Sequence, residues 1–349
     1  MVLALLALWL YRTAIARDRD PDHRSRATRV NPARLSRRGK LVLRLRDRLP
    51  GLGVNLPRLT AVGVRTLPPF SFGALRFLIG GALLLVIARA LPGFRMPASR
   101  SDWSLEWRRI LIVGATACMV SNGCNGWGLQ YVASNQAALL NATVAFWVTL
   151  FGLFGARGHA PSRRAWTGIA VGLVGTALIL LPRAPAGPVL PSPYGPLIPE
   201  LVVLCGCMGW AAGTVLQRTT HAGFDLLTFT ALQQIVGGLM LLAVGGANGE
   251  FARDWNWSAG AMFALGYMAI VSSCIAYTAY AWLTQNAAPS QIGTYALVNP
   301  AVATLLGWLA LDEHLVTAQW LGMVVILTGV VLVNWSALRG GAVLIRGSD

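Results

Sequence analysis

Long apolar runs separated by short polar breaks make up most of the chain after residue 68. Nine of them reach, or nearly reach, the roughly 20 residues that carry a helix across about 30 Å of hydrocarbon. They cover residues 69–91, 110–131, 134–156, 166–182, 198–217, 226–246, 259–284, 290–311 and 317–335. Two connections, Val132–Ala133 and Asn286–Pro289, are so short that the helices they join must be neighbours. The pattern predicts an all-α integral membrane protein.

The apolar pattern occurs twice along the chain. The segment from Ser134 to Gly175 recurs in altered form from Ser290 to Gly329, with an offset of 156 residues at the serines and 154 at the glycines. An offset of about 157 relates GALRFLIGGALLL, from Gly73, to TALQQIVGGLMLL, from Thr230. Both copies contain W-x-G-x6-G, at Trp166, Gly168 and Gly175 and at Trp320, Gly322 and Gly329. Duplicated membrane units of this kind favour a transporter.

The first unit lacks one good helix. The second unit supplies five spans, so the first should begin with a span near residues 40–63, which reads KLVLRLRDRLPGLGVNLPRLTAVGV. A central Arg or Asp costs about 2.5–3.5 kcal/mol on the insertion scale, so its run of charges forbids ordinary insertion of residues 40–48. The preceding MVLALLALWLY is apolar for only eleven residues. Residues 1–48 are therefore atypical, and a frame-disrupted start is one hypothesis for them.

The duplication predicts ten helices in two units, with the first helix degenerate and nine clear spans. Because each unit has five spans, the second inserts upside down relative to the first, as an inverted repeat. The expected segments are a basic N-terminal segment (1–48), a first unit (49–185), a second unit (196–338) and a tail (339–349).

Loop charges predict the orientation. With a cytoplasmic N-terminus, the outer loops carry three arginines, Arg65, Arg183 and Arg253. The inner loops and tail carry ten, namely Arg95, Arg100, Arg108, Arg109, Arg157, Arg163, Arg164, Arg218, Arg339 and Arg346. This asymmetry obeys the positive-inside rule. We expect a multi-pass protein of the bacterial inner (plasma) membrane with both termini in the cytoplasm.

Composition narrows the function classes. Of the 349 residues 55% are hydrophobic and 12% charged, against about 25% charged in soluble domains. The net charge is +16, but Lys40 is the only lysine among 29 basic residues and no nucleic-acid-binding motif accompanies them, so we expect no nucleic-acid partner. The five cysteines lie in apolar runs without disulfide or zinc spacing. HExxH, GxSxG and phosphate-binding glycine loops are missing, so we expect no metal, no cofactor and no enzyme.

Three segments carry a resemblance to a known family. They are LPPFSFGALRFLIGGALLL (67–85), NGCNGWGLQYVASNQAALLNAT (122–143) and APSQIGTYALVNPAVATLLGWLALDEHLVTAQWLGMVVILTGVVLV (288–333). With them the chain resembles the EamA-type transporters of the drug/metabolite transporter superfamily. That resemblance implies two inverted five-helix bundles, a central substrate cavity and alternating access, with amino acids, other metabolites or drugs commonly moved outward.

The resemblance therefore predicts a secondary transporter that exports a small organic metabolite, with the lipid bilayer as its surroundings. Two departures stand out: only Gly53–Asn55 remains of the family's W-G-x-N-like turn in the first helix, and Val144 replaces the proline that matches Pro300. A non-transporting paralogue with a damaged first helix is the alternative, and a membrane-embedded enzyme is a weaker one.

Intramembrane charges are rare and mark functional candidates. Arg76 lies seven residues beyond Pro69, and its repeat mate is Gln233. Arg76 could anchor a substrate carboxylate or act in a gate, or it could cap helix carbonyls or reach outward to the interface. Glu200 could exchange protons or simply lie at the interface.

Polar and aromatic residues in the spans form the remaining pathway candidates. Since polar side chains inside hydrocarbon must face protein or water, they either line the pathway or join helices by hydrogen bonds. Asn122 and Asn125 share a helical face, and Pro300 should free carbonyl groups beside Asn299. Trp147 could line a cavity or fill the core. The candidates are Arg76, Asn122, Asn125, Gln130, Tyr131, Asn141, Trp147, Gln233, Tyr277, Tyr280, Gln291, Tyr295, Asn299 and Pro300.

Overall fold

The computed structural model describes residues 63–64, 66–91, 94, 100–152, 163–180, 190–218, 223–286, 317–333 and 335. Within these ranges every regular element is a helix, as the apolar pattern predicts. The basic N-terminal segment, the degenerate first helix, the span expected at 290–311 and the candidates Gln291, Tyr295, Asn299 and Pro300 lie outside the described residues.

Within the described ranges, four helical segments are long and apolar enough to cross a membrane, namely Pro69–Ala90, Leu197–Gln217, Leu226–Ala247 and Ala259–Thr284. They correspond to helix α4 (Pro69–Ala90), most of α10 (Leu197–Arg218), α11 (Leu226–Ala247) and a longer helix that begins with α12 (Ala259–Tyr267). Shorter apolar helices occupy Gln136–Gly152 and Trp320–Val333. Four predicted spans are confirmed as helices of membrane-crossing length.

Two composite helices contain π-helical segments at matching places. In the first unit, α5 (Arg100–Val113) continues through η2 (Gly114–Val120) into α6 (Ser121–Gly128). In the second unit, α12 (Ala259–Tyr267) continues through η4 (Met268–Ala276) into α13 (Tyr277–Asn286). Such π-helical turns are rare and are frequently found at functional sites.

Helix starts are stabilised by side-chain oxygens. Asp225 precedes α11 and accepts hydrogen bonds of 3.1 Å from the amides of both Leu227 and Thr228. Ser258 likewise accepts a 3.2 Å hydrogen bond from the amide of Ala261 at the start of α12. Asp and Ser are favoured N-cap residues because they satisfy amides that have no partner inside the helix.

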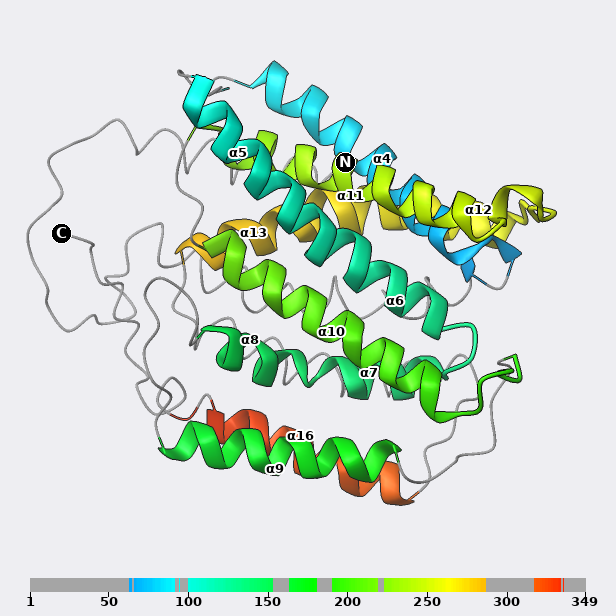
Figure 1. Ribbon diagram of the computed structural model, residues 1–349, viewed down its shortest axis with the longest axis vertical. Coiled ribbons are helices and arrows are strands. Elements are labelled where there is room, and N and C mark those ends of the chain that lie inside the picture. The colour runs from blue at the N-terminus through cyan, green and yellow to red at the C-terminus, as the bar shows by residue number, and fades with distance from the viewer. Residues whose placement is uncertain are drawn as a thin grey trace, which may run out of the picture.

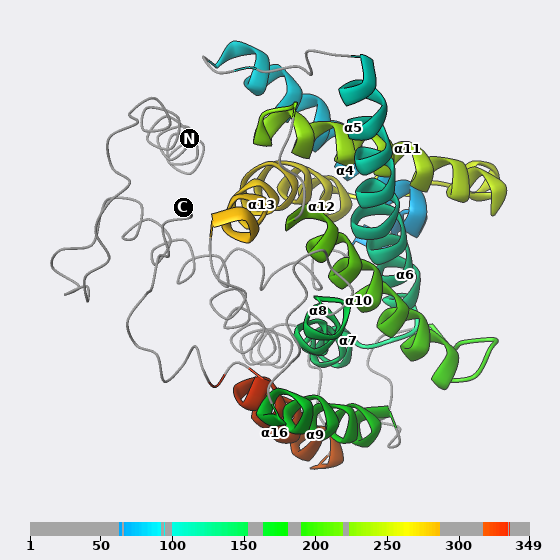
Figure 2. The ribbon, with the colours of Figure 1, turned by 60° about the vertical axis from the view of Figure 1, so that its left-hand side comes forward.

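Helices α9 (Arg163–Leu180) and α16 (Thr317–Val333) pack along one another at one edge of the molecule (Figures 1 and 2). Their glycines make reciprocal close approaches. A Cβ on Gly175 would lie 2.9 Å from the carbonyl oxygen of Gly322, and one on Gly329 would lie 2.6 Å from that of Gly168. These are the glycines of the repeated W-x-G-x6-G motif, and the second glycine of each motif meets the first glycine of the other.

Helices α4 and α11 show the same reciprocity. A Cβ on Gly81 would lie 2.9 Å from the carbonyl oxygen of Ala231, and one on Gly238 would lie 3.2 Å from that of Ala74. Gly81 and Gly238, like Ala74 and Ala231, are 157 residues apart. Across a two-fold axis every contact occurs twice. If residue i of one unit touches residue j of the other unit, then residue j of the first unit touches residue i of the second. The two repeated helices therefore contact each other in the manner of a local two-fold.

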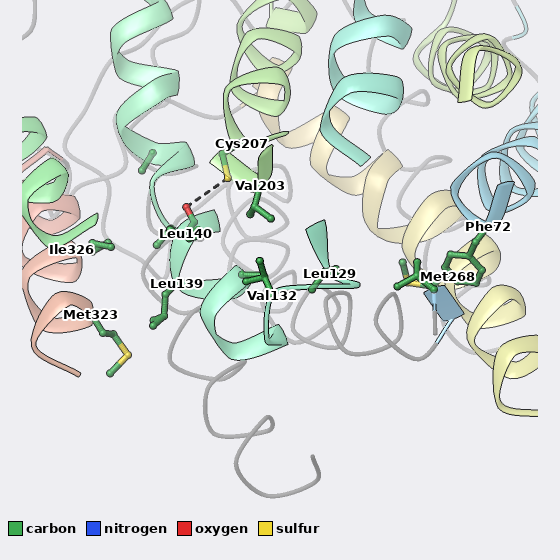
Figure 3. Packing of buried hydrophobic residues seen from close by; sticks show 14 of the residues in the cluster. Phe72, Leu129, Val132, Leu139, Leu140, Val203, Cys207, Met268, Met323 and Ile326 are labelled. Atoms are coloured by element: carbon green, nitrogen blue, oxygen red, sulfur yellow. Dashed lines mark hydrogen bonds between the residues drawn. The ribbon is translucent and has the colours of Figure 1, made fainter. Parts of the chain in front are cut away.

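Among the described residues, an extended apolar cluster runs through α7 (Ser134–Asn141), α8 (Val144–Gly152) and α10. It reaches α16 on one side and Phe72 and Met268 on the other (Figure 3). Leu140 and Cys207 are fully buried there, and the thiol of Cys207 donates to the carbonyl oxygen of Leu140 over 3.6 Å. Met323 and Ile326 bring α16 against the same cluster. The cluster thus joins elements of both repeated units.

Candidate functional site

The buried guanidinium group of Arg76 is the central feature of the candidate site. Arg76 lies in α4, is only 4% exposed, and donates from Nη2 to Oδ1 of Asn122 over 2.9 Å. A charged side chain near the middle of a span costs about 2.5–3.5 kcal/mol, while a hydrogen bond to a charged group returns about 1.5–3 kcal/mol. Asn122 therefore offsets much of the cost without neutralising the charge.

Asn122 itself is held by its position after the π-helical segment η2. Its Nδ2 donates to the carbonyl oxygen of Ala117, five residues earlier, over 2.9 Å. A carbonyl five residues back is the partner that a π-helical turn presents. The two contacts orient the amide, because its oxygen can accept from the guanidinium group of Arg76 while its nitrogen donates to the carbonyl oxygen of Ala117.

The region around Arg76 contains three further side chains, those of Tyr277, Trp210 and Cys118. Tyr277 is buried at the start of α13, and its hydroxyl group lies 3.8 Å from the sulfur of Cys118. The ring of Trp210, from α10, packs edge-on against Tyr277 with 5.5 Å between centroids. Tyr277 is 155 residues from Asn122, and each directly or nearly follows a π-helical segment. The repeat thus places an amide and a phenol at matching positions.

Gln233, the repeat mate of Arg76, is fully buried in α11. Neither Nε2 nor Oε1 of its amide has a hydrogen-bond partner within the described part of the chain. Leaving a buried polar group unpaired costs about 1–3 kcal/mol, so such a group calls for an explanation. The next residue, Gln234, by contrast donates to the carbonyl oxygen of Ser273 over 3.0 Å.

A second set of polar contacts joins four helices. Nδ2 of Asn141, at the end of α7, donates to Oδ1 of Asn125 in α6 over 3.1 Å, and the thiol of Cys207 lies 3.4 Å from Oδ1 of Asn141. Asn125 also donates to the carbonyl oxygen of Ser121 over 2.8 Å. Tyr280 is buried, and its hydroxyl group lies 3.0 Å from Oγ1 of Thr214. These candidates link α6, α7, α10 and α13.

Three candidates lie away from Arg76. Gln130 and Tyr131 occupy the turn after α6, where the carbonyl oxygen of Gln130 accepts a hydrogen bond from the amide of Leu190. Tyr131 packs against the ring of Trp127, 5.0 Å away between centroids. Trp147, in α8, donates from Nε1 to Oγ1 of Thr143 over 3.2 Å. That these three residues line the pathway stays a prediction.

Glu200 lies in the first turn of α10, where Oε1 accepts a hydrogen bond from Nε2 of Gln136 in α7. Among the described residues no group of three or more His, Cys, Asp or Glu is placed to hold a metal ion. The described site combines amides, phenols, thiols and one guanidinium group with the carboxylate of Glu200.

Comparison with known proteins decides the family. The model of the EamA-like transporter family matches residues 57–181 and again 197–335, which together make up most of the chain. The chain belongs to the EamA-like transporter family. The same family model thus matches two separate stretches of the chain.

Two relatives of this EamA-like chain carry the name of transporters. It is 31% identical over 274 residues to the uncharacterized inner membrane transporter YedA of Escherichia coli (strain K12), which covers 78% of this chain and 84% of YedA. It is 26% identical over 287 residues to the uncharacterized transporter YvbV of Bacillus subtilis (strain 168), covering 81% and 87% of the two chains. A solved crystal structure with 20% identity and a TM-score of 0.60 covers 86% of this chain and all of its own, and it shares the fold.

Family membership changes how the polar residues are interpreted. An EamA-like chain with membrane-crossing apolar helices is a multi-pass integral membrane protein, and its relatives point to transport rather than enzyme chemistry. Sequence reasoning missed two contributors, Thr214 and Glu250, because each makes its contact with a partner far along the chain. The only signal in the sequence for Glu250 is an acidic residue just after an apolar run.

Proposed function

We propose that this EamA-like chain is a secondary transporter that exports a small organic metabolite across the bacterial inner membrane. Its two units, residues 49–185 and 196–338, would be inverted relative to each other, with both termini in the cytoplasm. They would alternate between inward-open and outward-open arrangements, driven by a gradient of substrate or ion.

The observation that carries the proposal is the reciprocal packing of repeated helices. Gly81 approaches Ala231 as Gly238 approaches Ala74, and the glycines of α9 and α16 meet in the same reciprocal way. Contacts of this kind are what two inverted units around an axis in the membrane plane make. Such a symmetric pair has two equivalent arrangements, which is the physical basis of alternating access.

A third reciprocal contact links the composite helices to the α4–α11 pair. A Cβ on Gly80 would lie 3.0 Å from the carbonyl oxygen of Ala269, and one on Gly237 would lie 2.8 Å from that of Gly114. Gly114 is the first residue of the π-helical segment η2, and Ala269 is the second residue of the matching segment η4. The polar candidates Asn122 and Tyr277 follow these turns, which supports a pathway along this part of the unit interface.

The remaining candidates extend the proposed pathway. Asn125 and Asn141 in the first unit, and Tyr280 with Gln291, Tyr295, Asn299 and Pro300 in the second, would line it. In transporters of inverted-repeat architecture, substrate sites lie near the bilayer midplane between the repeats.

Efflux measurements test the proposal. Cells that express the chain and cells that do not are loaded with a panel of radiolabelled amino acids and organic acids, and release is followed after dilution. Faster release of at least one compound by the expressing cells is expected. A chain that inserts correctly, also with an unbroken apolar first helix restored, yet changes no flux would favour the non-transporting alternative instead.

A further inference from the structure

We propose that the substrate is a monocarboxylate with an apolar or aromatic body, and that Arg76 and Asn122 bind its carboxylate group. The inference rests on the proposed transport function and names the chemical class of the molecule carried. It follows from the charge, the donors and the surroundings of Arg76.

The charge of Arg76 is not matched by any described carboxylate. The one ion pair within the described ranges joins Arg109 to Glu106 over 2.8 Å. Glu250 accepts hydrogen bonds from residues at the start of α4, and Asp225 accepts them at the start of α11. Glu200 accepts from Gln136. A positive charge buried among apolar helices, with no counter-ion among the described residues, favours an anionic ligand.

Arg76 also has donors to offer. A guanidinium group has five N–H donors in a planar fork that matches a carboxylate in bidentate fashion. Asn122 uses Nη2, whereas the buried Nε has no hydrogen-bond partner in the part of the chain that the structure describes. Asn122 holds the side chain in place but leaves its charge and part of its fork available.

The surroundings of this charge are apolar and aromatic. The centre of the guanidinium group lies 4.4 Å from the centroid of the Phe77 ring. Phe77, Tyr277 and the partly buried Trp210 belong to one apolar cluster with Leu241. A carboxylate beside these rings suits a molecule whose remaining atoms are apolar, since the low local dielectric strengthens the ionic contact.

Gln233, the repeat mate of Arg76, limits the number of negative charges that the substrate would carry. At the position that matches Arg76, the second unit has Gln233, whose buried amide is neutral and has no described partner. A symmetric pair of arginines would suit a dianion. A single arginine, with a neutral amide at the matching position of the other unit, suits one carboxylate and leaves the amide to bind a second, uncharged polar group.

Binding measurements on the full-length protein in lipid nanodiscs test this assignment. The probes are pairs of a carboxylate and its neutral amide, namely acetate with acetamide, hexanoate with hexanamide and benzoate with benzamide. A ligand that binds the folded state raises its melting temperature by mass action. We expect at least one acid, hexanoate or benzoate foremost, to raise the melting temperature while its amide does not.

Two substitutions test whether Arg76 and Asn122 bind the acid. Arg76→Gln removes the charge, and Asn122→Asp places an internal carboxylate next to it, so both should weaken acid binding by about tenfold or more. Matched controls are Arg89→Gln, an exposed arginine of the same helix, and Asn248→Asp, an exposed asparagine after α11; both should keep the acid preference. In the Asn122→Asp variant the new carboxylate pairs with the buried charge of Arg76. This variant therefore tests whether a protein that still folds and inserts loses acid binding.

The outcomes separate the site from transport. Equal shifts by acids and amides, no shift by any acid, or an acid preference that survives Arg76→Gln would overturn the carboxylate assignment. Proteoliposomes that exchange labelled compounds without preferring acids would leave transport standing and remove this inference. Acid binding that depends on Arg76 in a protein that moves no compound would retain the site and refute the proposed transport.

Discussion

The hydroxyl group of Ser71 donates a 2.7 Å hydrogen bond to Oε2 of Glu250, which lies 179 residues further along the chain. The same oxygen accepts from the amide of Ser71 over 2.8 Å, and Oε1 accepts from the amide of Phe70 over 3.1 Å. Glu250 is 1% exposed. One carboxylate from beyond α11 thus satisfies the first amides of α4, where negative charge is favoured by the helix dipole.

Glu250→Ala should destabilise the protein by about 1–3 kcal/mol, because it leaves buried donors at the start of α4 without an acceptor. Thermal unfolding in nanodiscs would measure the loss. Asp254→Ala, at an exposed position in the same loop, should change stability little. Equal effects of the two substitutions would show that the cap contributes nothing specific.

Gly329→Val should weaken the packing of α9 against α16. The added atoms would collide with the backbone of α9, since a Cβ at this position would already lie 2.6 Å from the carbonyl oxygen of Gly168, and overpacking of this kind costs about 1–3 kcal/mol. Gly266→Val is the matched control, because a Cβ on Gly266 meets nothing within 4 Å. Size-exclusion chromatography with thermal challenge would compare them, and a Gly329→Val protein as stable as the control would contradict the prediction.

Tyr280 and Thr214 should be coupled in a double-mutant cycle. Their hydroxyl groups lie 3.0 Å apart in a buried place, and hydrogen bonds between membrane helices average about 0.6 kcal/mol, with a maximum of about 1.7. We expect a coupling energy in that range from Tyr280→Phe, Thr214→Val and the double variant, measured by unfolding in mixed micelles. Purely additive effects would show that the two hydroxyl groups act independently.

Thiol labelling should report the orientation. In a background without the five native cysteines, Asp254→Cys should react with a membrane-impermeant maleimide added to intact cells, whereas Arg163→Cys should react only after permeabilisation. Both positions are exposed, and the loop arginines place Asp254 outside and Arg163 inside. The reverse pattern would invert the topology, and labelling of both from outside would refute the span count.

Much of the candidate site could be predicted from the repeat, but its contacts could not. Comparison of the copies paired Arg76 with Gln233 and marked Asn122, Asn125, Tyr277 and Tyr280 as polar residues in spans. Arg76 donates a hydrogen bond to Asn122 on another helix, and the π-helical turn before Asn122 positions that amide. Gln130 and Tyr131, read as part of a span, lie in the turn after α6, because helix ends are poorly specified by apolar pattern alone.

The sequence by itself determined that the chain is a duplicated, helical membrane protein, since only long apolar helices satisfy their backbone groups inside lipid. It also determined which positions match between the copies. Only the tertiary structure decided that Glu250 caps α4, that glycines 154 or 157 residues apart take part in reciprocal contacts, and that Gln233 is buried without a described partner. Periodicity shows which face of a helix is apolar, whereas the partner across that face depends on how all the helices pack together.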